Sequence, residues 1–118
     1  MDISKKIAEM KQNPVFAENV GMLLIHNGTV RSWSRADHRA VSKIEVQADV
    51  EKIEQIRTEI EQRKGIFQVV VEARSGVMMP GDDLLFLIVA GDIREHVKPA
   101  MAELLDRVKA EAITKKEM

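Results

Sequence analysis

The stretch PGDDLLFLIVA, residues 80–90, decides the fold. Residues 80–83 have the chemistry of a tight turn, since proline fixes φ and glycine tolerates positive φ. Leu84 to Ala90 then contains no polar residue, which predicts a strand that is covered on both faces. The rest of the chain must therefore supply the layers that cover this strand.

Three other segments have strand patterns. Residues 66–71 are rich in β-branched side chains, and the short connection from there to the apolar run at 84–90 predicts an antiparallel pair. Residues 20–26 form a second apolar run, which predicts another buried strand. Val41 to Val46 alternates apolar and polar residues, which is typical of a strand with one buried face.

Helical periodicity marks three further segments. Asp49 to Arg63 is the clearest, with Asp49 as the N-cap, a stripe of isoleucines on one side, and Gly65 just beyond its end. Residues 3–11 predict a short amphipathic helix. From about Arg94 the pattern predicts a long helix that continues toward the C-terminus.

The order of these helices and strands predicts an α+β fold with a mostly antiparallel sheet and a long C-terminal helix. The length fits a single domain over residues 1–118, in which residues 1–19 are an N-terminal helix and lead-in. The chain contains no internal repeat and no low-complexity tract.

Composition excludes several classes of protein. The formal net charge of −1 argues against a general nucleic-acid-binding protein, which is usually basic. The chain has no cysteine, which removes disulfides and thiolate chemistry and fits a reducing compartment. No apolar run approaches the roughly 20 residues of a membrane span, and the N-terminus has no signal-peptide core. We therefore expect a cytoplasmic protein without nucleic-acid or membrane partners.

Common catalytic motifs are absent from the sequence. His26, His38 and His96 are far apart along the chain, so no metal site is expected. The sequence has no Gly-x-Ser-x-Gly element and no glycine-rich phosphate loop. Gly-Asp-Asp at 81–83 could bind magnesium, but after a proline this pattern is more often part of a turn.

Cationic side chains remain as the candidates for function. Arg31, Arg74 and Arg94 lie near the ends of apolar segments, and Lys109 and Lys116 lie on the last predicted helix. Arginine binds phosphate and carboxylate with paired hydrogen bonds, and clustered cations lower the pKa of a lysine. In an unbroken helix the two lysines would share a face, about 10 Å apart along the axis. Each cation taken alone is more often solvated surface, so these residues by themselves indicate only a domain that binds an anion.

Three short motifs of the chain match motifs of a known protein family. Residues 28–31, Gly-Thr-Val-Arg, match an element at the end of the family's first strand. Residues 80–90 match its Pro-Gly-Asp turn and following apolar strand, and Arg74 and Gly76 match its Arg-x-Gly. Together these motifs resemble the large (catalytic) subunit of molybdopterin synthase, the MoaE family. The resemblance covers about residues 20–117 and identifies the chain as a short, divergent member of this family.

The resemblance also implies roles for the cations. In an ungapped alignment Lys109 falls on the family's central catalytic lysine and Lys116 on its second, assisting lysine. Arg31 and Arg94 are expected to bind the substrate phosphate or the carboxyl group of the partner. Arg74 is expected to belong to the same anion-binding set.

The function that the resemblance implies is the biosynthesis of the molybdenum cofactor. Such enzymes have an α/β-hammerhead fold and form a homodimer of large subunits. Each active site takes the C-terminal Gly-Gly tail of a small ubiquitin-like sulfur-carrier subunit, which bears a thiocarboxylate. Sulfur passes to cyclic pyranopterin monophosphate, a pterin phosphate substrate, to form molybdopterin, and no permanently bound cofactor is expected.

The sequence departs from the family at several positions. Ile93 and Ala73 stand where the family has histidines, and residues 113–115 replace a Pro-Phe-Trp element. Family members usually continue beyond the position of Met118 with a tail that completes the pocket or the partner interface. We therefore keep a second interpretation, a non-catalytic family member that binds a pterin or another anion or acts as a regulator. A chance match by an unrelated α+β domain is the third.

Asn27-Gly28 allows two interpretations. Asn-Gly is the strongest short-range signal for a hairpin turn. The alignment instead favours Gly28 within or at a bulge of a continuing strand, with Arg31 and Trp33 on one side of it. Trp33, the only tryptophan, could form a pocket wall or a dimer contact.

Overall fold

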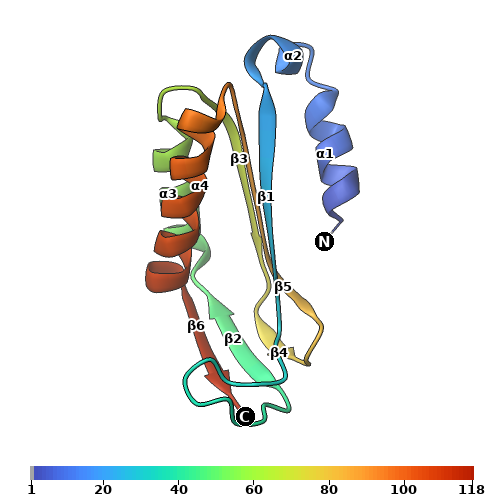
Figure 1. Ribbon diagram of the computed structural model, residues 1–118, viewed down its shortest axis with the longest axis vertical. Helices are drawn as coiled ribbons and strands as arrows, with labels where there is room; N and C mark the ends of the chain where they lie inside the picture. Colours follow the sequence, from blue (N-terminus) through green and yellow to red (C-terminus); the bar gives the residue numbers. More distant parts are fainter. Residues whose placement is uncertain (1) are drawn as a thin grey trace.

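The computed structural model describes residues 2–118, which form two antiparallel sheets and an elongated molecule 47 Å long and 25 Å across (Figure 1). The first sheet has the order β1-β5-β3, with β1 at Met22–Thr29, β5 at Asp83–Gly91 and β3 at Ile66–Ala73. The central strand, β5, is buried from Leu84 onward. The prediction of an apolar strand covered on both faces is confirmed, as is its antiparallel pairing with β3.

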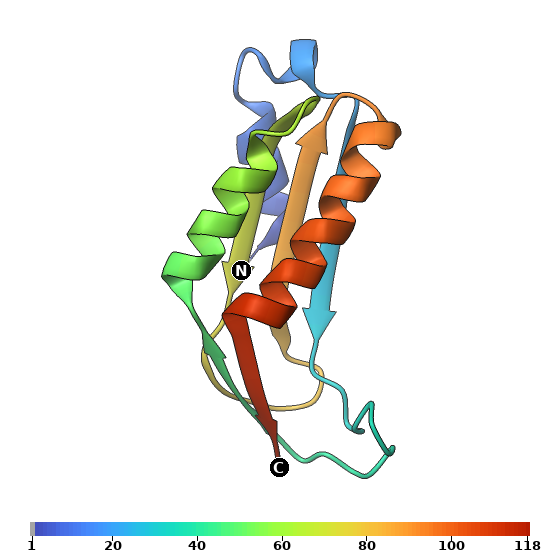
Figure 2. The same ribbon diagram turned by 90° about the vertical axis from the view of Figure 1, so that its left-hand side faces the viewer.

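Helices cover both faces of this sheet. The helices α3, Val50–Glu61, and α4, Arg94–Arg107, lie side by side on one face (Figure 2). The helix α1, Ile3–Lys11, packs on the opposite face and is joined to β1 through a short helix, α2, at Phe16–Asn19. Successive β5 side chains therefore enter different cores, Leu87 beneath α3 and α4 and Ile88 against Met10 of α1. The predicted α+β class with antiparallel sheets is confirmed.

The expected cap of the helix near residue 50 is also found. The side chain of Asp49 accepts a hydrogen bond of 3.0 Å from the backbone N–H of Lys52. Gly65, beyond the helix end, has φ +81°, a conformation that favours glycine. A Cβ at Gly65 would also collide with the side chains of Asp92 and His96, so this glycine permits a close approach between the ends of α3 and β5.

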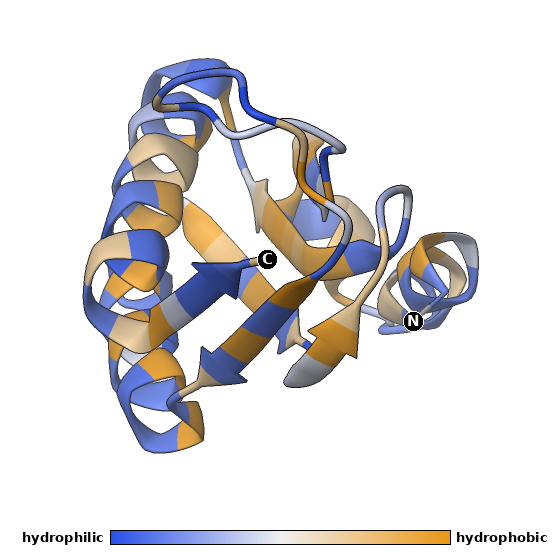
Figure 3. Ribbon diagram, turned by 90° about the horizontal axis from the view of Figure 1, so that it is seen from below, coloured by the Kyte–Doolittle hydropathy of each residue, from blue (hydrophilic) through white to orange (hydrophobic). Residues whose placement is uncertain are grey.

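The second sheet lies at the lower end of the molecule in Figure 1 and has the order β4-β2-β6. The strand β2 is Ile44–Ala48, β4 is Gly76–Met78 and β6 is Ile113–Glu117. In Figure 3 the strand β2 alternates between hydrophobic and hydrophilic residues, as predicted, whereas β6 is mostly hydrophilic. This sheet therefore combines a buried face with a polar edge strand.

The prediction that the last helix continues toward the C-terminus is wrong. The helix α4 ends at Arg107, a π-helical turn, η1, spans Val108–Ala112, and the chain then enters β6. The cause is pairing with β2, since the backbone N–H of Asp49 donates to the carbonyl of Ala112 at 2.7 Å and Val46 lies opposite Lys115. The strand partner supplies hydrogen bonds that a further helical turn would otherwise provide.

Gly28 lies inside β1, so the hairpin interpretation of Asn27-Gly28 is wrong and the bulge interpretation is confirmed. The register between β1 and β5 shifts between Gly28 and Thr29. A Cβ at Gly28 would stand 3.2 Å from Nε2 of His26 and 3.6 Å from Cβ of Leu85, so the glycine permits a close approach. The strand β1 is an edge strand and is only half-buried, unlike the fully buried strand that its apolar run predicts.

Within residues 2–118, no helix is long and apolar enough to cross a membrane.

Candidate anion-binding pocket

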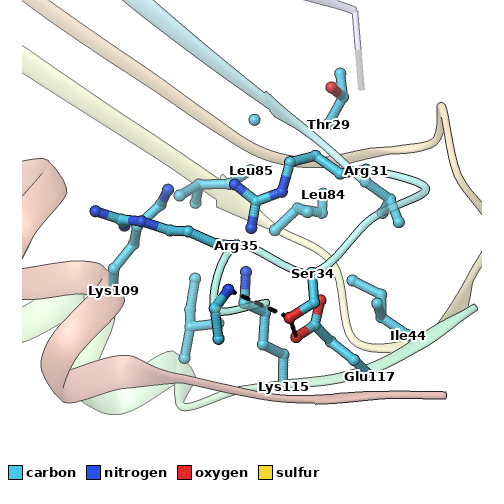
Figure 4. Close-up of a pocket in the computed structure, with 14 residues that line it drawn as sticks. Thr29, Arg31, Ser34, Arg35, Ile44, Leu84, Leu85, Lys109, Lys115 and Glu117 are labelled. Atoms are coloured by element: carbon cyan, nitrogen blue, oxygen red, sulfur yellow. Dashed lines mark hydrogen bonds between the residues drawn. The ribbon is translucent and has the colours of Figure 1, made fainter. Parts of the chain in front are cut away.

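A cavity of about 570 Å³ opens where the two sheets meet (Figure 4). Its walls come from the end of β1, the loop of residues 30–43 that follows it, the start of β5, η1 and β6. Apolar side chains, among them Leu84, Leu85 and Ile113, form one part of the lining. The volume falls within the range of about 300–1,000 Å³ typical of small-molecule sites.

Four cationic side chains line this cavity, against a single carboxylate. Arg31 and Arg35 come from the loop, Lys109 from η1, and Lys115 and the carboxylate Glu117 from β6. Figure 4 shows that the side chains of Arg31, Arg35 and Lys109 extend into the same space. Such an excess of positive charge suits a ligand that carries phosphate or carboxylate groups.

Two of the residues predicted from the sequence, Lys109 and Arg31, are brought together here. Partial desolvation lowers the pKa of Lys109, and the charges of Lys115, Arg31 and Arg35 lower it further. A lysine with a lowered pKa has a larger neutral fraction at pH 7 and can act as a base or a nucleophile. Lys109 is therefore our candidate for a reactive group in this pocket.

Lys116, the second lysine predicted from the sequence, does not line the pocket. Successive side chains of a strand point to opposite faces, and in β6 the residues that line the pocket are Ile113, Lys115 and Glu117. Lys116 lies on the other face and is paired in register with Glu45 of β2. The expectation of two lysines on one helical face fails because the helix ends at η1.

Arg74 and Arg94 also lie outside the lining. The Nη1 of Arg74 donates a 3.1 Å hydrogen bond to the backbone carbonyl of Asp83, which braces the connection between β3 and β4. Arg94 begins α4 at the opposite end of the molecule, with its side chain 77% exposed and 3.4 Å from Glu95. At 1.5 Å per residue, the helix places Arg94 about 20 Å from Lys109 along its axis.

A buried polar contact joins the loop to β6. Ser34 is only 2% exposed, and its hydroxyl donates a 3.1 Å hydrogen bond to Oε1 of Glu117. The same oxygen of Ser34 accepts from the backbone N–H of Ala36 at 3.4 Å. This contact closes one side of the pocket and holds Glu117 in its wall (Figure 4).

Two cations of the pocket, Arg35 and Lys115, were not singled out from the sequence. Arg35 follows Arg31 within RSWSR, and an irregular loop has no period that shows where its side chains point. If the end of the helix were known, the alternation of side chains along a strand would place Lys115 on the same face as Ile113.

His26 lies beside the pocket, on β1. Its Nε2 atom is buried and has no hydrogen-bond partner within residues 2–118. Burial lowers the pKa of His26, and the charge of Lys109 lowers it further. Both effects favour the neutral form of the imidazole beside the cationic cluster.

The described residues offer no metal centre. Among residues 2–118, no group of three or more His, Cys, Asp or Glu side chains is placed to hold a metal ion. The side chain of Asp82, in the Gly-Asp-Asp element, accepts a 2.9 Å hydrogen bond from the backbone N–H of Met79. A contact of this kind between a side chain and the nearby backbone is typical of a turn.

Comparisons with known proteins agree with this fold. The model of a family described as MoaE protein matches residues 1–111. The chain is similar to the molybdopterin biosynthesis MoaE protein from Burkholderia ambifaria MC40-6, with 25% identity, a TM-score of 0.78, and coverage of 99% of this chain and 76% of that chain. A comparison with curated protein sequences found no match.

Two further solved structures share the fold. Molybdopterin synthase from Staphylococcus aureus is 24% identical, with a TM-score of 0.72 and coverage of 84% of this chain and 74% of that chain. The protein–protein complex of subunits 1 and 2 of molybdopterin-converting factor from Helicobacter pylori 26695 contains a chain that is 14% identical, with a TM-score of 0.70. The match covers 98% of this chain and 78% of that chain.

Proposed function

The chain belongs to the MoaE protein family, a family of molybdenum cofactor biosynthesis, and from this premise we propose that it is the catalytic large subunit of a molybdopterin synthase. It transfers sulfur from a thiocarboxylate on a small subunit to cyclic pyranopterin monophosphate. The observation that carries the proposal is the gathering of Arg31, Arg35, Lys109 and Lys115 around one cavity of about 570 Å³.

The pocket suits a pterin phosphate in both size and chemistry. The arginine side chains present planar forks that match the oxygens of a phosphate group. The apolar wall formed by Leu84, Leu85 and Ile113 can take the flat face of a pterin ring. The substrate is the only small molecule required, with no permanently bound cofactor.

Lys109 is the central catalytic residue of the proposal. Once the thiocarboxylate sulfur has bonded to the pterin substrate, water hydrolyses the acyl–sulfur bond, so that the sulfur stays on the pterin and the tail leaves as a carboxylate. The Lys109 amine, with a lowered pKa, can accept the proton of that water. We assign the assisting role to Lys115 in place of Lys116, because Lys115 lines the pocket beside Lys109. Its charge can stabilise the anionic sulfur group of the partner.

The proposed partner is a small ubiquitin-like sulfur-carrier subunit whose C-terminal Gly-Gly tail enters the pocket. A related fold occurs in the Helicobacter pylori complex of the two subunits of molybdopterin-converting factor, which supports such a pairing. The active form is proposed to be a homodimer of large subunits. Arg94 lies too far from Lys109 within one chain, so any contribution from Arg94 would come from the second copy.

A reconstitution assay tests this proposal. The protein is mixed with thiocarboxylated small subunit and cyclic pyranopterin monophosphate, and molybdopterin is measured. Wild type forms product, and Lys109→Ala lowers the rate by at least about 10²-fold, as expected for loss of a charged group at the reacting centre. Lys98→Ala, a matched change of an exposed lysine on α4, keeps the rate within about twofold. An inactive wild type, in conditions where an established synthase works, would refute the proposal.

The second candidate function is binding without sulfur transfer. Ile93, which stands where the family has a histidine, is 50% exposed and offers no proton. If the chain only binds or regulates, wild type will bind the pterin phosphate by calorimetry and yet form no molybdopterin. Product formation by wild type would exclude this alternative.

A further inference from the structure

Trp33, the only tryptophan, lies against the pocket arginine instead of forming the pocket wall. The Cζ atom of Arg31 is 4.8 Å from the centre of the indole ring, which is a cation–π contact. Arg31 lines the cavity, whereas Trp33 is not among the lining residues and is 41% exposed. The indole therefore acts on the pocket only through Arg31.

The loop holds the indole in place from two directions. The imidazole of His38 stacks on Trp33, with ring centres 4.9 Å apart and an interplanar angle of 15°. Trp33 also forms an isolated β-bridge with Ala40. The next residue, Ser34, donates its backbone N–H to the carbonyl of Arg39 at 2.9 Å, which closes the loop on itself.

The backbone of His38 is unusual. Its φ of +60° makes it the one non-glycine residue with positive φ within residues 2–118. Its N–H donates to the carbonyl of Ser34 at 2.9 Å, which is one of the contacts that hold this conformation. A backbone conformation of this kind persists where contacts with the surrounding structure fix it, and such conformations are concentrated at functional sites. In this conformation the imidazole ring of His38 stacks on the indole.

Arg31 depends on this contact for its orientation. Among residues 2–118, no ion pair or hydrogen bond fixes its guanidinium, and the group it rests on is the indole ring. A cation–π contact uses the face of the guanidinium and leaves the N–H donors at its edge free. These donors are the groups that would bind a phosphate in the cavity.

We propose that Trp33, supported by His38, is a positioning residue that holds the Arg31 guanidinium toward the pocket and so sets the affinity for the anionic group of the substrate. The inference rests on the proposed function for the identity of that substrate. The contact between Arg31 and Trp33 can be tested without catalysis.

The first test uses indole fluorescence, which reports on Trp33 alone because the chain has one tryptophan. Arg31→Ala and His38→Asn should each change the emission spectrum, since each removes a group that touches the ring. Asparagine tolerates positive φ, so His38→Asn keeps the backbone while removing the imidazole. Arg39→Ala, a matched change in the same loop, should leave the emission unchanged. Unchanged emission in Arg31→Ala would overturn the proposal.

The second test uses steady-state kinetics with cyclic pyranopterin monophosphate. Trp33→Leu should raise KM about two- to fivefold, the range of a partly exposed cation–π contact, with kcat within about twofold. Trp33→Phe keeps an aromatic face and should recover most of the affinity. Thermal melts of both variants should match wild type. Equal KM values for wild type and an active, folded Trp33→Leu would overturn the proposal.

The two tests separate this inference from the proposed function. A wild type that forms no molybdopterin would refute the function, while the fluorescence comparison would still decide whether Arg31 rests on Trp33. Active enzyme with a normal KM in Trp33→Leu would refute the positioning role and leave the function intact.

Discussion

The two sheets of this protein differ in the burial and the charge of their strands. In the first sheet β5 is buried on both faces and carries no charged side chain after Asp83. In the second sheet β6 is short, lies at an edge and places charged side chains on both of its faces. The first sheet therefore contains the most deeply buried strand, and the second, with the loop and η1 beside it, carries the cations of the candidate site. Changes in the two regions should affect different measurements.

Truncation in β5 should have the largest effect, and it should be an effect on stability. Leu87 is fully buried beneath α3 and α4, so Leu87→Ala should lower the free energy of unfolding by about 2–5 kcal/mol. Ile25 lies on the neighbouring edge strand and is 43% exposed, so Ile25→Ala should cost less than about 1 kcal/mol. Urea denaturation measures both. Similar losses for the two variants would contradict the contrast between buried and edge strands.

Neighbouring lysines of β6 should differ in activity and not in stability. Lys115→Ala removes a pocket cation and should lower kcat/KM by about 10²-fold. Lys116→Ala alters the outer face of the strand and should change kcat/KM by less than about threefold. The molybdopterin assay checks both, with thermal melts as the control for folding. A larger loss of kcat/KM in Lys116→Ala than in Lys115→Ala would show that the ungapped alignment is right and that the pocket face of β6 is misassigned.

The contact between Ser34 and Glu117 is buried and also forms part of the pocket wall, so its loss should affect both stability and activity. Ser34→Ala removes a buried hydrogen bond and should lower the free energy of unfolding by about 1–2 kcal/mol. Ser42→Ala, which removes an exposed hydroxyl bonded to the carbonyl of Met118, is the matched control with a smaller cost. Unfolding by urea and KM for the pterin phosphate are measured together. A change in neither would mean that Glu117 does not need Ser34 for its position.

The smallest effect should be a dependence of stability on pH that arises from His26. Its folded-state pKa is lowered below 6.5, so the unfolded chain binds the proton more readily. This contribution to stability is fully present above pH 6.5 and is lost as the pH falls below it. His26→Phe should therefore show a shallower loss of stability between about pH 7.5 and 5.5 than wild type. Identical slopes for the two proteins would contradict the assignment.

The same contrast explains which parts of the structure can be predicted from the sequence. The apolar run of β5 and the isoleucine stripe of α3 are long, periodic signals, and both elements are found where they are predicted. A short family motif identifies Arg31, the ungapped alignment identifies Lys109, and both residues line the pocket. Local patterns and family motifs were therefore sufficient for the core and for half of the cationic cluster.

The other half of the cluster depends on contacts that no local pattern contains. Nothing in residues 108–113 is a strong helix breaker, and the helix ends because β2 pairs with the segment that follows it. Lys115 is directed into the pocket by that pairing. Arg35 is placed by an irregular loop that the contact of Ser34 with Glu117 ties to the second sheet. Tertiary pairing overrides local propensity at both positions.

The π-helical turn η1 has a consequence for how changes in chain length can be tolerated before β6. The hydrogen bonds of a π turn enclose one residue more than those of an α turn. A single insertion or deletion can therefore convert one kind of turn into the other without moving the strand that follows. Because β6 is anchored by its register with β2, a one-residue insertion or deletion in η1 would leave the position of Lys115 facing the cavity and change only its number along the chain. Relatives that differ in length at this turn should keep their pocket lysine at the same place in the fold, offset by one residue in an ungapped alignment.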